Sequence, residues 1–350
     1  MLKRILPAIV ALCAAASICA GCASTWAPNS IPLSEQTQWR DQANAPLVRH
    51  VETITGFKRT KTTMSGILQY IVFGKSSAET MFGSPTAVAV GSDNRMAVAD
   101  MGRSCVHLYV PAEHRYRRIA EAGMEPLRTP VGVAFDADHR LYVSDSTTGA
   151  VQVYDAAGEF LLSLRQAGAA AIRRPTGLAY SPVSKQIYVA DTLAGRIYAF
   201  APGGEYRFSI GGSGEQTGQF NFPTHVAIGP DGSIYVVDAM NFRVQVFDAS
   251  GAFRSSFGHH GNGSGDLAMP KGIAVDAAGV IYIVDTLFDT VQFFNLSGDL
   301  LFAIGGRGSG PGELTMPSGL FLGTGNRLYV CDTYNQRVQI FQVTGSAPHE

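Results

Sequence analysis

Residues 223–258 read PTHVAIGPDGSIYVVDAMNFRVQVFDASGAFRSSFG. Four short runs rich in β-branched and aromatic residues occupy this stretch, and the turn signals Asp231-Gly232 and Ser250-Gly251 separate runs that can pair as hairpins. A proline, Pro223, opens the first run, and an aspartate, Asp238, ends the second. The pattern predicts four short antiparallel strands.

The same pattern recurs along the chain with a period of 45 to 48 residues. The opening proline occurs at Pro85, Pro130, Pro175, Pro223, Pro270 and Pro317. The aspartate recurs at Asp100, Asp145, Asp191, Asp238, Asp285 and Asp332. A fixed period of this length indicates a repeat architecture, and four strands per unit are typical of one propeller blade. We therefore predict an all-β protein, a six-bladed β-propeller.

The sixth unit lacks its own fourth run, because the chain ends soon after Val343. Ile71-Val72-Phe73-Gly74 precedes Pro85 by nearly the interval that separates Gly258 from Pro270. We expect an N-terminal strand at Leu68–Phe73 to close the last blade, which would cover sheet edges that otherwise invite aggregation. The propeller is predicted to span residues 67–343, with a tail at 344–350.

The sequence resembles the NHL-repeat family over residues 67–343. The segments Gly218–Pro223, Ile234–Asp238 and Asn241–Phe247 carry the resemblance. It implies the propeller fold. Members of this family serve as enzymes, protein-binding platforms and RNA-binding surfaces, so the fold alone does not select a function.

Composition excludes some classes of protein. The 350 residues are 46% hydrophobic and 16% charged, which is a globular composition. The formal net charge of −1 gives no sequence-wide basic footprint for nucleic acid. The dense basic runs, 58–61 and 115–118, lie in a predicted tether and on a predicted outer strand, where solvated surface is expected. We expect no nucleic-acid partner.

The N-terminal residues have the layout of a targeting signal. Lys3 and Arg4 precede an apolar run that is too short to cross a bilayer comfortably, so residues 1–21 are predicted to be a signal peptide. The segment Ile18–Cys22 resembles the bacterial lipobox, although Cys19 stands where leucine is usual. This implies lipidation of Cys22 and an acyl anchor in a membrane of the bacterial envelope, the outer membrane if the source is Gram-negative. Plain secretion and an uncleaved anchor are the alternatives.

Residues 22–66 show no sustained period and are interpreted as a tether, in which Leu47–Ile54 could dock on the main domain as a strand. Two cysteines, Cys105 and Cys331, remain in the body of the protein. They are expected either to be small buried side chains or to form a single disulfide.

The six repeated aspartates invite a metal hypothesis, which we reject because sixfold placement keeps them apart, whereas Ca²⁺ needs six to eight oxygens around one point. An aspartate at a strand end can instead accept hydrogen bonds from its own turn. Arg196, Arg243 and Arg337 each lie five residues after their aspartate, so ion pairs are expected in those blades.

The position two residues after each proline should lie at the mouth of the central channel. Propeller lyases that resemble this family place zinc-binding histidines there, and catalytic zinc usually has three protein ligands. This chain has Ala87, Gly132, Gly177, His225, Gly272 and Gly319 at these positions. His259 and His260 could join His225, which leaves a metal-dependent lyase or hydrolase, with zinc or calcium, as the alternative function. Otherwise no cofactor is expected.

We expect a binding or scaffold module rather than an enzyme. Its surface should be the top face, defined as the face where the inner strands begin and where the turns after the repeated aspartates lie. The expected contacts are His225, Met240, Phe242, Phe288, Arg307 and Tyr334. The competing interpretation is that the aromatic residues pack between blades. The expected partners are the membrane, through the acyl anchor, and a protein or envelope polymer.

Overall fold

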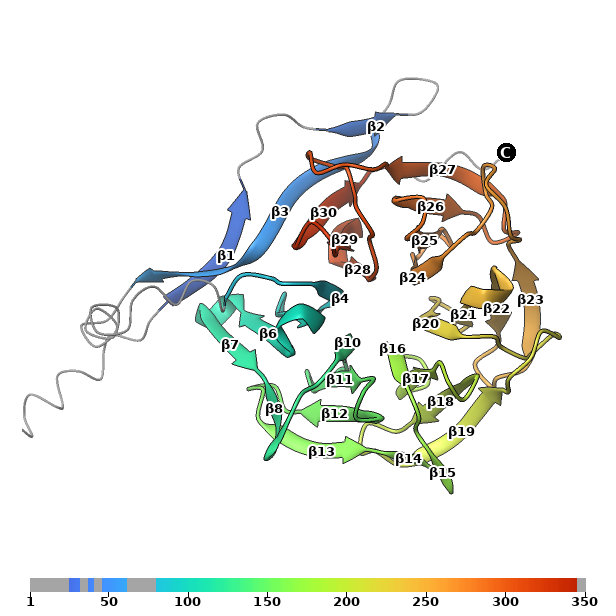
Figure 1. The fold of residues 1–350 in the computed structure, drawn as a ribbon, viewed down its shortest axis with the longest axis horizontal. Coiled ribbons are helices and arrows are strands. Elements are labelled where there is room, and N and C mark those ends of the chain that lie inside the picture. Colours follow the sequence, from blue (N-terminus) through green and yellow to red (C-terminus); the bar gives the residue numbers. More distant parts are fainter. Residues whose placement is uncertain (1–24, 32–36, 41–45, 62–79, 345–350) are drawn as a thin grey trace, which may run out of the picture.

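The computed structural model describes residues 25–31, 37–40, 46–61 and 80–344. Six antiparallel sheets stand around a central channel like the blades of a propeller (Figure 1). The predicted signal peptide, Cys22 and the tail at 345–350 lie outside the described residues. The all-β, six-bladed prediction is confirmed.

Each of the first five blades is a four-stranded sheet whose strands follow the chain order from the channel outward. Blade 1 contains β4 (Pro85–Val90), β5 (Met96–Asp100), β6 (Cys105–Val110) and β7 (Arg115–Ile119). Blade 2 contains β10 (Pro130–Phe135), β11 (Leu141–Asp145), β12 (Ala150–Tyr154) and β13 (Phe160–Leu164). Blade 3 contains β16 (Pro175–Ser181), β17 (Gln186–Asp191), β18 (Arg196–Phe200) and β19 (Tyr206–Gly211).

Blade 4 contains β20 (Pro223–Ile228), β21 (Ile234–Asp238), β22 (Arg243–Phe247) and β23 (Phe253–Phe257). Blade 5 contains β24 (Pro270–Val275), β25 (Ile281–Asp285), β26 (Thr290–Phe294) and β27 (Leu300–Gly305). The second strand of every blade is buried along its whole repeated run, because neighbouring blades cover both faces of its sheet. This explains why these strands are nearly continuous apolar runs rather than alternating ones.

Blade 6 joins the two ends of the chain. It contains β28 (Leu320–Gly323), β29 (Arg327–Asp332) and β30 (Arg337–Val343), and its fourth strand is β3 (Pro46–Lys61). Val48 pairs with Val343 and Ile54 with Val338, so β3 covers the free edge of β30. Two further strands, β1 (Thr25–Ile31) and β2 (Gln38–Arg40), pair with β3 on the outside of the ring (Figure 1).

The closing strand corrects two predictions. An N-terminal strand does close the ring, but β3 occupies the edge of β30 that we assigned to Leu68–Phe73, a segment outside the described residues. A strand has two edges, and β29 takes the other edge of β30. The expected tether at 22–66 therefore contains part of the propeller, and docking of Leu47–Ile54 as a strand is confirmed.

Small elements complete the fold. Two hairpins precede blades 2 and 3, β8 (Glu121–Ala122) with β9 (Glu125–Pro126) and β14 (Gln166–Ala167) with β15 (Ala170–Ala171). Within residues 80–344, four single-turn 3₁₀ helices lie in turns, at Met101–Arg103, Pro111–Glu113, Ala239–Asn241 and Thr324–Asn326. No helix in the described part of the chain is long and apolar enough to cross a membrane. Cys105 and Cys331 are buried free thiols rather than a disulfide.

The repeated aspartates hold the loop that leads into each blade. All six carboxylates are fully buried. Each accepts a hydrogen bond from a backbone N–H of the leading loop, which we define as the residues immediately before the repeated proline. The donors are Gly83 at 2.7 Å, Arg128 at 2.7 Å, Arg173 at 2.7 Å, Asn221 at 2.6 Å, Ala268 at 2.7 Å and Thr315 at 2.8 Å. These charge-assisted bonds compensate the burial of the carboxylates.

The aspartates also accept bonds from their own turns, as expected. Leu287 N donates to Asp285 at 3.1 Å, for example. The expected ion pairs form in two blades, Arg243 with Asp238 at 2.8 Å and Arg337 with Asp332 at 2.6 Å. The ion pair expected between Arg196 and Asp191 does not form. Within the described chain Arg196 makes no ion pair and donates to Ser209 Oγ instead.

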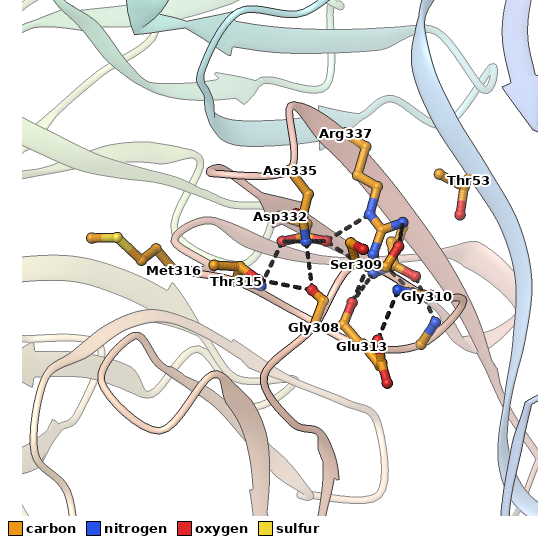
Figure 2. Close-up of polar contacts among 12 residues, drawn as sticks. Thr53, Gly308, Ser309, Gly310, Glu313, Thr315, Met316, Asp332, Asn335 and Arg337 are labelled. Carbon is orange, nitrogen blue, oxygen red and sulfur yellow. Dashed lines mark hydrogen bonds and ion pairs between the residues drawn. The ribbon is translucent and has the colours of Figure 1, made fainter.

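Blade 6 has the most extensive of these networks (Figure 2). Arg337 donates to Asp332 and also to the carbonyls of Ser309 at 2.7 Å and Gly310 at 2.9 Å. Asn335 Nδ2 donates to Gly308 O at 2.8 Å. The leading loop before Pro317 is thus held at several consecutive carbonyls, which fixes the position of Met316 and of the turn after Asp332.

A hydroxyl after the aspartate connects successive blades. In four blades it donates to the carbonyl of the proline that opens the next blade. The pairs are Ser146 to Pro175 at 2.6 Å, Thr192 to Pro223 at 2.8 Å, Thr286 to Pro317 at 2.7 Å and Thr333 to Pro85 at 2.8 Å. The last of these joins blade 6 to blade 1, so the ring is closed at the channel as well as by β3.

Removing the Thr333 hydroxyl should destabilise the closed ring. We expect Thr333→Val to lower the free energy of unfolding by about 1–2 kcal/mol, because it leaves the Pro85 carbonyl without its donor. Thr217→Val, at an exposed loop residue whose hydroxyl has no hydrogen-bond partner in the described chain, should cost less than about 0.5 kcal/mol. Chemical denaturation measures both. Equal stability of Thr333→Val and wild type would contradict this role.

Closure by β3 should also depend on pH. His50 is fully buried, its Nε2 lies 2.9 Å from Thr53 Oγ1, and its Nδ1 has no partner. Burial, assisted by the charge of Arg337, lowers the pKa of His50 to about 4. The unfolded chain binds this proton below its ordinary pKa of about 6.5, whereas the folded chain does not, so stability falls as the pH drops from 6.5 towards 4.

We expect His50→Gln to reduce the loss of unfolding free energy between pH 7 and pH 5 by about 1–2 kcal/mol. Denaturation curves at the two pH values measure this loss. His114→Asn, a change at an exposed turn residue, should keep the wild-type difference. The assignment fails if His50→Gln and wild type lose the same free energy.

Candidate functional site

The inner strands surround a cavity that opens on the top face. Its volume is about 770 Å³, within the range of small-molecule sites. The first residues of the six inner strands form its wall. Those immediately after the repeated prolines are Thr86, Val131, Thr176, Thr224, Lys271 and Ser318. Met101, Met316 and Tyr334 lie at its rim.

Close approach of the inner strands explains the small residues two positions after five of the six prolines. A Cβ atom on Gly132 would lie 2.2 Å from the Thr176 carbonyl oxygen, and one on Gly177 would lie 2.5 Å from His225 Cα. Such contacts do not occur in proteins, so glycine is required at both positions. The scarcity of histidine at the channel mouth therefore has a steric cause.

His225 lies in the wall of the channel, as predicted. It borders both the top cavity and a smaller cavity of about 260 Å³ farther along the channel. Burial lowers its pKa to about 4, so the imidazole is neutral at pH 7. Within the described chain neither ring nitrogen has a hydrogen-bond partner. His225 can therefore donate or accept one bond inside the cavity.

The structure does not assemble the three histidines into a metal site. His259 is exposed and its Nε2 lies 2.6 Å from Asp266 Oδ1. His260 packs its ring against Phe242, with the ring centroids 4.2 Å apart. Among the described residues, no group of three histidine, cysteine or acidic side chains could hold a metal ion. His225, His259 and His260, the candidate ligands of the alternative function, are therefore not brought together in the described part of the chain.

The other expected top-face residues divide into two groups. Met240 is 54% exposed and Tyr334 is 70% exposed, and Arg307 is also exposed. Phe242 and Phe288 are partly buried. Phe242 has a positive φ of 54° and packs against the core between blades 4 and 5, so the alternative of packing between blades holds for this residue.

Sequence reasoning missed most of the exposed apolar side chains of the top-face turns. The further exposed apolar side chains in the turns after the aspartates and immediately before the prolines are Met101, Leu193, Phe222, Met269, Leu287 and Met316. A signal was present, because Leu193 and Leu287 lie two residues after their aspartates, as Met240 and Tyr334 do. We name these six residues, together with Met240 and Tyr334, the apolar ring.

Lys271 was also missed. It is half-buried in the cavity wall, and burial lowers its pKa. Among the described residues that line the top cavity, it is the one charged side chain, and it forms no ion pair with them or with the rest of the described chain. The signal was its place in the repeat, since the other five inner strands carry threonine, serine or valine there.

Comparisons with known proteins agree with this architecture. Residues 229–300 match a family model described as a six-bladed β-propeller, and residues 127–154 and 314–341 match the NHL repeat. No curated protein matches the chain in sequence.

Solved structures are similar in fold at low identity. Virginiamycin B lyase from Staphylococcus aureus is 12% identical with a TM-score of 0.56, over 75% of this chain and 86% of that one. A gluconolactonase from Xanthomonas campestris is 16% identical with a TM-score of 0.58, over 75% and 87%. Such identities establish the fold and no activity. The chain is a six-bladed β-propeller that contains segments matching the NHL repeat.

Proposed function

We propose that the protein is an envelope-anchored lipoprotein whose propeller binds a partner through the top face without catalysing a reaction. The observation that carries the proposal is the apolar ring. Of the fifteen large hydrophobic side chains exposed in the described chain, the eight members of this ring lie in the top-face turns, and three of them, Met101, Met316 and Tyr334, line the top cavity. Grouped apolar side chains of this kind mark interaction sites, whereas scattered ones do not.

The opposite face of the propeller exposes fewer apolar side chains in its turns. Its turns expose Val183 and Leu296, which belong to different blades. The top face in addition has a hollow of about 420 Å³ between blades 3 and 4, lined in part by Leu193 and Phe222. This combination of apolar side chains and a hollow suits a protein that inserts an apolar side chain, with Arg307 available for a polar contact at the edge.

Blade 5 offers a matched test of the binding face. Leu287 and Leu296 are 62% and 61% exposed on opposite faces. With a photo-crosslinking residue in place of Met240, we expect Leu287→Ser to reduce partner crosslinking in the envelope by about tenfold, equivalent to about 1.4 kcal/mol. Leu296→Ser should leave it unchanged. Equal effects of the two changes, or no effect of either, would refute the top-face proposal.

The anchor is tested separately. Cys22→Ser should abolish acyl labelling and release the protein from membranes, because each buried acyl CH₂ group contributes about 0.8 kcal/mol to membrane binding. Cys13→Ser removes a thiol from the predicted signal peptide outside the lipobox-like segment and should keep both the label and the membrane association. Subcellular fractionation with a labelled fatty acid measures both properties. Undiminished membrane retention of Cys22→Ser would contradict lipidation as the anchor.

A further inference from the structure

The top cavity has an uncompensated positive charge. Sixteen of the residues that the structure describes line it, and among them Lys271 is charged and no acidic residue occurs. The six repeated aspartates cannot supply the counter-charge, because their carboxylates are fully buried and bound to the leading loops. A half-buried ammonium without an opposite charge has an unfavourable environment, as the lowered pKa of Lys271 indicates. An anion in the cavity would relieve it.

Most hydroxyl groups of the wall already donate elsewhere. Thr224 Oγ1 donates to Lys271 O at 3.4 Å, Ser318 Oγ to Thr86 O at 3.0 Å, and Thr333 Oγ1 to Pro85 O at 2.8 Å. Among the described lining residues, the polar side chains without a hydrogen-bond partner are Ser84, His225, Lys271, Tyr334 and Gln336. The cavity therefore presents one cation and a few neutral polar groups to a ligand.

The other wall residues determine which kind of chemical group can be attached to the anionic group of a ligand. Met101, Met316 and Val131 provide apolar surface near the mouth, and Tyr334 adds an aromatic ring. Methionine adapts its shape to a ligand and makes favourable contacts with aromatic rings. A single cation matches a single negative charge and repels cations, and a neutral ligand would leave Lys271 uncompensated.

We propose that the top cavity binds a small organic monoanion, a carboxylate with an apolar or aromatic body, whose carboxylate pairs with Lys271. The apolar body would lie against Met101, Met316 and Tyr334 at the mouth. This site goes beyond the proposed protein-binding face and does not depend on it, because crosslinking from position 240 and ligand binding in the cavity can each fail without the other.

Calorimetric titration of the full chain with 3-phenylpropionate tests the site, with the neutral 3-phenylpropanamide as the matched ligand. We expect saturable binding of one carboxylate per chain and a loss of about tenfold in affinity in Lys271→Gln, because the charge-assisted contact is removed. Lys271→Arg should restore most of the affinity. Lys185→Gln makes the same change at an exposed turn of blade 3 and should bind as wild type.

Three outcomes would overturn the proposal: no saturable binding of 3-phenylpropionate, undiminished affinity in Lys271→Gln, or equal affinity of wild type for the carboxylate and the amide. Thermal unfolding of Lys271→Gln checks its folding. If that variant is unfolded, Lys271→Arg and the carboxylate-to-amide comparison on wild type decide the matter. Lost affinity in Lys185→Gln as well would also count against a specific site.

Discussion

One buried carboxylate per blade positions everything that faces the channel. The aspartate at the end of the second strand accepts hydrogen bonds from amides that lie some seventeen residues earlier, and this ties the leading loop to the middle of the blade. A carboxylate removed from water is costly unless such bonds replace its hydration. The chain therefore has to bring the leading loop to the aspartate, and the proline and the residue after it then begin the inner strand at the channel wall.

The blades are joined into a ring by contacts of two kinds. Hydroxyls next to the aspartates donate to the proline carbonyl of the following blade, so the same turn that holds its own leading loop also holds the next inner strand. The β3 strand then supplies the edge partner of β30 from the other end of the chain. A ring closed in both ways has no unpaired edge at the junction, which is the hazard of an open sheet array.

The period made the fold predictable, because each unit shows the same proline, aspartate and turns. The closing strand could not be found in this way. The residues of β3 share no repeat signature, and its contacts, such as His50 against Phe341 and Phe57 against Phe82, join distant parts of the chain. The exposure of Met240 and Tyr334 was predictable from their turns. The sequence left exposure and packing between blades open for Phe242, because its partial burial depends on a positive φ and on a neighbouring blade.

Some residues differ from those at the same position in the other blades. For one of them the structure shows the reason, and for two it does not. His107 stands where four of the other five blades carry glutamine. Its Nε2 lies 3.2 Å from Asp100 and its Nδ1 lies 2.9 Å from the Tyr116 hydroxyl, so its polar groups are satisfied within blade 1. His225 and Lys271 also depart from the repeat, but the described chain supplies no partner for either side chain, and both face the same cavity. Six identical blades would form a symmetric channel with no preferred side. Because His225 and Lys271 lie on adjacent inner strands and lack hydrogen-bond or ion-pair partners in the described chain, the channel wall of blades 4 and 5 is where a ligand would supply those partners.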